Sequence, residues 1–191
     1  MSKEMSDARL RAEADRILEE KGIRSIVSRY GNVHVCGSYA LRLMAWRDLD
    51  IYLDLPGLDE KVFQALGAEL ASALTPTRVS YHNRVTDPVP GEPLGLYYGL
   101  RLGDLASGGW KIDLWALEPA DLTERIGREE RLAARLTDTT RESILAIKGR
   151  LWTHPEYRKS ITSQDIYRAV LDGGVSDLDG FWAFLGRAPD P

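Results

Sequence analysis

Hydrophobic residues along the chain follow two different periods. Between residues 33 and 117, short apolar runs alternate with polar positions, and Pro or Gly ends most of them. This pattern predicts strands at 33–36, 48–55, 77–81, 94–102 and 110–117. Helical spacing of apolar residues predicts helices at 7–21, 39–46, 62–74 and 177–185, and three more between Pro119 and Leu171. A short glycine-rich segment joins the last two strands, which is typical of an antiparallel hairpin.

The order of these elements separates the chain into two parts. Strands and helices mix up to about residue 118, without a regular strand–helix–strand alternation, and only helices follow. This order favours an α+β fold with a mixed sheet. We expect an α/β core with an N-terminal helix at 1–118 and a helical segment at 119–191. In that segment, Thr139 with Glu142 predicts a capping box, and Ser163 predicts a helix cap.

Composition narrows the class of protein. The chain has 191 residues, of which 43% are hydrophobic and 28% charged, with a net charge of −4. These values exclude global disorder, collagen-like sequence and coiled coil. Cys36 has no second cysteine with which to pair, which favours a reducing compartment, and the charged N-terminus lacks the apolar core of a leader. With no long apolar run, we expect a cytoplasmic protein that does not cross a membrane.

Three aspartates stand out on the predicted strands. Asp48 and Asp50 are two residues apart, so their carboxylates leave the same face of one strand. A solvated strand edge would accommodate them, but a divalent cation would turn their repulsion into coordination. Asp113 lies in an otherwise apolar strand, where an unpaired charge is costly. Lys111 shares the strand face of Asp113, so a counterion and a shared metal both explain that carboxylate.

Gly37-Ser38 lies between a strand and a short predicted helix. Glycine lets the backbone approach a ligand closely, and a helix N-terminus presents free N–H groups to phosphate. The serine hydroxyl adds one more hydrogen-bonding group. An ordinary turn with an N-cap is the alternative interpretation of this pair.

These motifs also stand in a characteristic order. Gly37-Ser38 is followed after nine residues by Asp48-Leu49-Asp50, and Asp113 lies on a later strand. The chain therefore resembles the nucleotidyltransferase superfamily with the DNA polymerase β-like catalytic core, over roughly residues 30–118. In size it is most similar to the small antibiotic-modifying and minimal members. It departs from many members in having no glycine at residues 39–46 and Arg47, rather than serine or threonine, before the first acid.

The resemblance implies a role for each of these residues. Gly37 and Ser38 would hold the β,γ-phosphates of a nucleoside triphosphate. Asp48 and Asp50 would bind Mg²⁺ or Mn²⁺, as two ions, and Asp113 would complete one metal site and help deprotonate or orient the acceptor. The implied activity is metal-dependent transfer of a nucleoside monophosphate from the triphosphate to an acceptor hydroxyl, with release of pyrophosphate.

The acceptor and two other functions stay open. A small hydroxylated acceptor is favoured over RNA or protein, because the net charge of −4 disfavours a long nucleic acid. A non-catalytic nucleotide- or partner-binding module on the same fold, such as a toxin–antitoxin component, is the main alternative. A nucleotide-sugar glycosyltransferase with an Asp-x-Asp motif is a third interpretation.

Other polar and aromatic residues have simpler expected roles. His34 and His82 are expected to be structural or solvated, Cys36 a small core residue, and Arg42 either a phosphate ligand or a solvated helix charge. Four aromatic residues on the hairpin are expected mostly in the core, with room for one to stack on a base: Tyr97, Tyr98, Trp110 and Trp115. The polar stretch at 150–168 would form either an ordinary helix surface, which we favour, or the acceptor side of a cleft.

Overall fold

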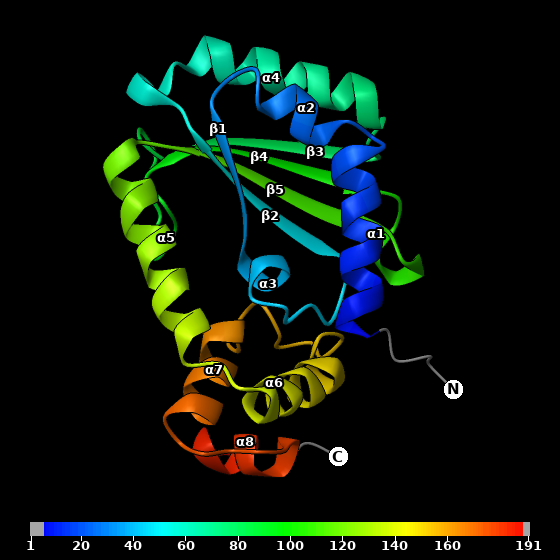
Figure 1. Ribbon diagram of the computed structural model, residues 1–191, viewed down its shortest axis with the longest axis vertical. Helices are drawn as coiled ribbons and strands as arrows, with labels where there is room; N and C mark the ends of the chain where they lie inside the picture. The colour runs from blue at the N-terminus through cyan, green and yellow to red at the C-terminus, as the bar shows by residue number, and fades with distance from the viewer. Residues whose placement is uncertain (1–5, 189–191) are drawn as a thin grey trace.

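The computed structural model describes residues 6–188, so the N-terminal residues that bear on a leader lie mostly outside it. One mixed sheet and a set of helices make up the fold (Figure 1). The strands are β1 (Asn32–Cys36), β2 (Asp48–Asp54), β3 (Arg78–Asn83), β4 (Gly95–Leu102) and β5 (Trp110–Leu117). The helices are α1 (Asp7–Glu19), α2 (Ile23–Val27), α3 (Gly37–Ala40), α4 (Glu60–Leu74), α5 (Pro119–Ala134), α6 (Asp138–Leu151), α7 (Ser163–Leu171) and α8 (Leu178–Phe184), with short 3₁₀ turns at Pro56–Leu58 and Leu105–Ser107. The predicted α+β class with a mixed sheet is confirmed.

The strand order in the sheet is β1-β2-β5-β4-β3. β2 and β5 run parallel, and the other neighbours run antiparallel, including the predicted β4–β5 hairpin. Parallel pairing in register places Asp50 directly beside Asp113. The sheet thereby unites the two acidic segments, which lie more than sixty residues apart along the chain.

Alternation along the strands divides the sheet into an apolar and a polar face. Leu49, Ile51 and Leu53 on β2 are buried in one cluster with residues of α1, α2 and α4. Asp48, Asp50 and Asp54 leave the opposite face. On α4 the buried stripe includes Phe63, whereas Val62, where the predicted helix begins, is exposed. The three helices therefore cover one face and leave the acids on the other.

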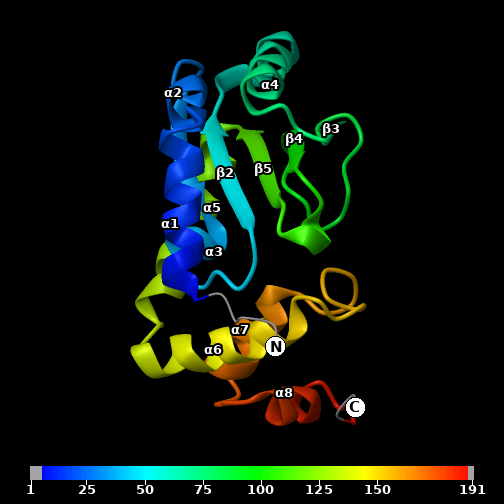
Figure 2. The same ribbon diagram turned by 90° about the vertical axis from the view of Figure 1, so that its right-hand side faces the viewer.

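A second hydrophobic cluster joins α6, α7 and α8, which gather at one end of the sheet (Figure 2). Leu41 and Leu43, from the segment after α3, are buried in this cluster. The helical segment thus packs on residues from the first part of the chain. The division of the chain at residue 118 stays a prediction.

Three local predictions were wrong. The expected helix at 39–46 is only the four residues of α3, because Arg42 has a left-handed backbone (φ 58°) that a helix does not continue through. The capping box of α6 uses Thr137 and Thr140 instead of Thr139 and Glu142. The cap of α7 is Thr162, paired with Asp165, one residue before Ser163.

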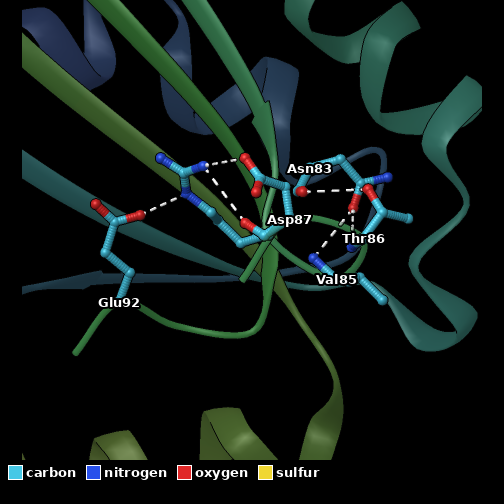
Figure 3. Close-up of polar contacts among 6 residues, drawn as sticks. Asn83, Val85, Thr86, Asp87 and Glu92 are labelled. Atoms are coloured by element: carbon cyan, nitrogen blue, oxygen red, sulfur yellow. Dashed lines mark hydrogen bonds and ion pairs between the residues drawn. The ribbon is translucent and has the colours of Figure 1, made fainter. Parts of the chain in front are cut away.

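The loop between β3 and β4 is held by its own side chains (Figure 3). The Asn83 side chain accepts hydrogen bonds from the backbone N–H groups of Val85 and Thr86, at 3.1 and 3.2 Å. Arg84 forms ion pairs with Asp87 at 3.2 Å and Glu92 at 2.5 Å. These contacts fix a segment whose Gly91 lines the cleft described below. No helix among residues 6–188 is long and apolar enough to cross a membrane.

Candidate active site

The three predicted acids converge at the polar face of the sheet. One oxygen from each of Asp48, Asp50 and Asp113 lies within 4.8 Å of the others. Asp113 is buried, and Asp48 and Asp50 are half-buried. The expected convergence of these side chains is confirmed, and it follows from same-face alternation on β2 and the parallel register of β5.

Lys111 lies among these carboxylates. Its Nζ donates a hydrogen bond to Asp48 Oδ1 at 3.2 Å, and it also forms an ion pair with Asp113. The Tyr97 hydroxyl donates to the other oxygen of Asp113 at 2.9 Å. The expected pairing of Lys111 with Asp113 is present, and the contact with Asp48 adds a cross-strand link. One ammonium therefore holds two of the acids from neighbouring strands.

Burial and mutual repulsion set the charge of the cluster. Burial raises the pKa of Asp48, against the opposing attraction of Lys111. Burial raises the pKa of Asp50 well above its ordinary value, and the nearby charge of Asp48 adds to that rise. Burial alone would lower the pKa of Lys111, but the charges of Asp48, Asp113 and Asp50 outweigh it and raise that pKa. The site is therefore strongly attractive to added positive charge.

The donor set fits a hard divalent cation. It offers carboxylate oxygens only, on two adjacent strands, and one oxygen of each acid lies close enough to the others to hold a metal ion. Burial raises the pKa of Asp48 and Asp50 even with Lys111 beside them, so it disfavours their charged forms. A bound cation would stabilise those charged forms, so the residues present fit Mg²⁺ or Mn²⁺.

Gly37 lies directly against Asp50. Its φ of 65° is left-handed, and a Cβ at this position would lie 2.5 Å from Asp50 Oδ2. Only glycine satisfies both conditions. The Gly37 N–H donates to Glu129 Oε2 of α5 at 2.6 Å. The amide therefore faces an anion, in this case a carboxylate of the same chain.

Ser38 occupies the first turn of α3 and lines the same cleft as Gly37, Asp48 and Asp50. The cleft has a volume of about 750 Å³ and lies between the sheet and the helical segment. Its lining includes Gly37, Ser38, Asp48, Asp50, Tyr52, Arg125, Arg128, Glu129, Lys148, Arg158, Ser163 and Gln164. The polar stretch at 150–168 thus contributes to the cleft wall, and whether it faces the acceptor stays a prediction.

Lys148 of α6 is a cleft residue that the sequence interpretation missed. Its side chain is 1% exposed, and its Nζ donates to the Leu43 carbonyl at 2.7 Å and to the Tyr167 hydroxyl at 3.4 Å. Burial lowers its pKa to about 8, although Asp48 and Asp50 attract its charge. The available signal was its position on the buried stripe of α6, between Ile147 and Leu151.

The other side chains considered from the sequence contribute no ligand atom to the acid cluster. His82 stacks on Tyr97, with ring centroids 5.5 Å apart, and Arg42 is exposed. Cys36 is buried, which raises the pKa of its thiol well above the ordinary value and opposes a nucleophilic role. Tyr98 packs with Phe63 on the apolar side of the sheet, as expected for a core aromatic.

Comparison with known proteins identifies the fold. No family model matches the chain, and no curated protein matches it by sequence. Among solved structures, Cid1 poly(U) polymerase bound to Mg and 3′-dATP aligns with a TM-score of 0.61 and 12% identity, over 88% of this chain and 50% of that chain. A cytoplasmic RNA terminal U-transferase aligns at 0.55 and 13%, over 88% and 47%. A MgGTP complex of Cid1 aligns at 0.57 and 13%, over 88% and 51%.

These alignments, at 12–13% identity, bear on the fold. They confirm the fold resemblance that the sequence motifs predicted, because Cid1 belongs to the nucleotidyltransferase superfamily. The present chain spans about half the length of these proteins.

Proposed function

We propose that this chain, which has the nucleotidyltransferase fold, is a metal-dependent enzyme that moves a nucleoside monophosphate from a triphosphate to an acceptor hydroxyl. One observation carries the proposal: three carboxylates lie within 4.8 Å of one another, against a glycine whose amide binds an anion. The fold alone would not require those residues. A non-catalytic binding module would have no need for the third acid on β5.

In this proposal, Asp48 and Asp50 would hold two Mg²⁺ or Mn²⁺ ions, and Asp113 would complete one of the two sites. When bound, the ions polarise the acceptor hydroxyl and neutralise charge on the triphosphate. The acceptor oxygen forms a bond to the α-phosphorus, the bond to the leaving pyrophosphate breaks, and the hydroxyl proton passes toward Asp113. Tyr97 and Lys111 orient the Asp113 carboxylate through their contacts with its two oxygens.

Gly37, Ser38 and the basic side chains of the cleft would bind the triphosphate. The Gly37 amide and the Ser38 hydroxyl supply hydrogen-bond donors beside Asp50. Arg125 and Arg128 of α5 and the buried Lys148 supply positive charge from the facing wall. The Glu129 carboxylate accepts the hydrogen bond from the Gly37 N–H, so an incoming phosphate must displace that carboxylate.

The acceptor remains the open part of this function. The compared structures include an RNA terminal U-transferase, so an RNA end stands beside a small hydroxylated molecule as an acceptor class to test. We also propose that the protein works in the cytoplasm, supported by a lone cysteine that is buried and free.

The test is pyrophosphate release from a mixture of nucleoside triphosphates with Mg²⁺, in the presence of pooled acceptors. Asp50→Asn should abolish release, whereas Asp54→Asn is a matched control. Asp54 lies on the same strand and face, and its side chain bonds to Asn32 outside the acid cluster. Equal pyrophosphate release by Asp50→Asn and the wild type would refute the proposed function.

A further inference from the structure

The register of the sheet sorts the side chains of its polar face into parallel rows. Asp50 and Asp113 lie side by side in one row, followed by Gly99 on β4 and Ser80 on β3. A row of rings flanks it on one side, and we call it the aromatic row: His34, Tyr52, Trp115, Tyr97 and His82, one from each strand. The row on the other side begins with Asp48 on β2 and continues with three cations, which we call the basic row: Lys111, Arg101 and Arg78.

The aromatic row is continuous over β5, β4 and β3. The rings of Tyr97 and Trp115 are 4.8 Å apart between centroids, and His82 stacks on Tyr97 at 5.5 Å with 18° between the ring planes. Tyr97 and Trp115 are half-buried and His82 is exposed, so part of each ring reaches the surface. The row begins beside the acid cluster, because the Tyr97 hydroxyl bonds to Asp113. The proposed reaction does not use this extended aromatic surface.

The basic row changes character along its length. Lys111 is neutralised by Asp48 and Asp113. Arg101 has a buried Nη1 without a hydrogen-bond partner among residues 6–188, and Arg78 is exposed at the edge strand. Beyond the acids, this row therefore carries two guanidinium groups, of which Arg101 is half-buried and Arg78 is open to solvent. Between the two rows lie only Gly99 and Ser80, whose side chains are absent or short.

We propose that this part of the polar face, on β4 and β3, binds the last nucleotides of a single-stranded nucleic acid whose 3′-hydroxyl reaches Asp113. Rings on one flank stack on bases regardless of sequence, and arginines on the other flank contact phosphates. The arginines would repel a cationic acceptor such as an aminosugar. A neutral polyol carries no charge with which the arginines could form an ion pair. The inference rests on the proposed function and names its acceptor class.

The arrangement also separates the two substrates. Gly37, Ser38 and Lys148 approach the acids from the side of β1 and α6, whereas the aromatic and basic rows extend on the side of β4 and β3. The two strand spacings from β5 to β3 cover about 10 Å, which suits a short single-stranded end and not a long duplex. The two arginines supply local positive charge for phosphate contacts, although the net charge of the chain is −4.

The test measures binding without catalysis. A short fluorescein-labelled single-stranded RNA of mixed sequence is titrated with the full chain, without Mg²⁺ or triphosphate, and anisotropy is recorded at several salt concentrations. His82→Ala should weaken binding by about fivefold or more, from the loss of one stacking ring. Arg78→Ala should weaken binding and lower the slope of log affinity against log salt by about 0.7, from the loss of one phosphate contact.

Lys61→Ala is the matched control, because Lys61 is exposed on α4 over the opposite face and carries the same charge as Arg78. It should leave affinity and salt slope unchanged. Matched DNA and duplex RNA complete the experiment, and weaker binding of the duplex supports the proposal. Wild-type affinity in both His82→Ala and Arg78→Ala, or no single-strand binding by the wild type, would overturn it. Since the assay contains no triphosphate, its result is independent of whether nucleotide transfer occurs.

Discussion

Replacing Lys111 with methionine removes the only ammonium that bridges Asp48 and Asp113 in the described part of the chain. Methionine keeps much of the length of the side chain and discards its charge. At the 3.2 Å separation of Lys111 Nζ and Asp48 Oδ1, the Coulomb attraction is about 5 kcal/mol for an effective dielectric constant near 20. The variant also avoids the free-energy cost of burying an ammonium, which offsets part of the lost attraction. Breaking such a buried ion pair costs about 3–5 kcal/mol of stability. The expected destabilisation at neutral pH is therefore about 3 kcal/mol.

The assay is thermal unfolding of Lys111→Met and the wild type at pH 7, with and without Mg²⁺. For a chain of this size, a loss of about 3 kcal/mol lowers Tm by about 6–12 °C. Mg²⁺ should restore much of that loss in Lys111→Met and stabilise the wild type less, because in the wild type Lys111 already neutralises the ligands. Lys61→Met on the exposed surface of α4 is the control and should leave Tm unchanged.

The loss of stability in Lys111→Met should also depend on pH in a defined direction. Burial raises the pKa of Asp48 and Asp50, so the folded protein keeps protons that the unfolded chain releases. Stability from those protons is present below the ordinary aspartate pKa of about 3.9 and is lost as pH rises through the raised values. The difference between Lys111→Met and the wild type should therefore be small near pH 4 and grow toward pH 7. Equal Tm values at pH 7, with equal responses to Mg²⁺, would refute this description of the site.

Three further variants test the triphosphate side of the cleft by calorimetry with Mg²⁺. Ser38→Ala should weaken triphosphate binding by about 1–2 kcal/mol, the worth of a hydrogen bond to a charged group, and unchanged affinity would limit Ser38 to a structural role. Glu129→Gln should tighten binding severalfold, because the neutral amide competes less well for the Gly37 N–H; weaker binding would show that Glu129 contacts the nucleotide instead. Wild-type affinity should fall as pH rises through about 8, where Lys148 loses its proton, while Lys148→Arg should stay flat across that range; parallel profiles would exclude Lys148 as a phosphate ligand.

The acid cluster could be predicted from sequence because each part of it follows from local rules. Strand alternation puts Asp48 and Asp50 on one face, and the spacing from Gly37-Ser38 matches a known motif order. The contact of Lys111 with Asp48 could not be predicted the same way. That contact depends on β2 and β5 being parallel neighbours in the sheet. The alternation of apolar and polar residues predicts the faces of each strand but not the order of the strands.

Local errors had local causes. Tyr39 to Trp46 has an apolar pattern that suits a helix, but the left-handed backbone at Arg42 turns the chain so that Leu41 and Leu43 pack against α6 and α7. Tertiary packing here overrides helix propensity. Lys148 was missed because a lysine in a helix is usually solvated, and its burial depends on the Leu43 carbonyl from a distant segment.

The central claim is that this protein transfers a nucleotidyl group at a site built from three acids on adjacent strands. Isotope labelling tests this claim most directly. Triphosphates labelled at the α-phosphorus or the γ-phosphorus are incubated with the chain, Mg²⁺ and a single-stranded RNA, and both the acceptor and the released phosphate are analysed. The account predicts α-label on the acceptor and γ-label in pyrophosphate, with the rate reduced by several orders of magnitude in Asp113→Asn and unchanged in Asp54→Asn. Transfer of the γ-label to the acceptor, or a near-normal rate in Asp113→Asn, would contradict it.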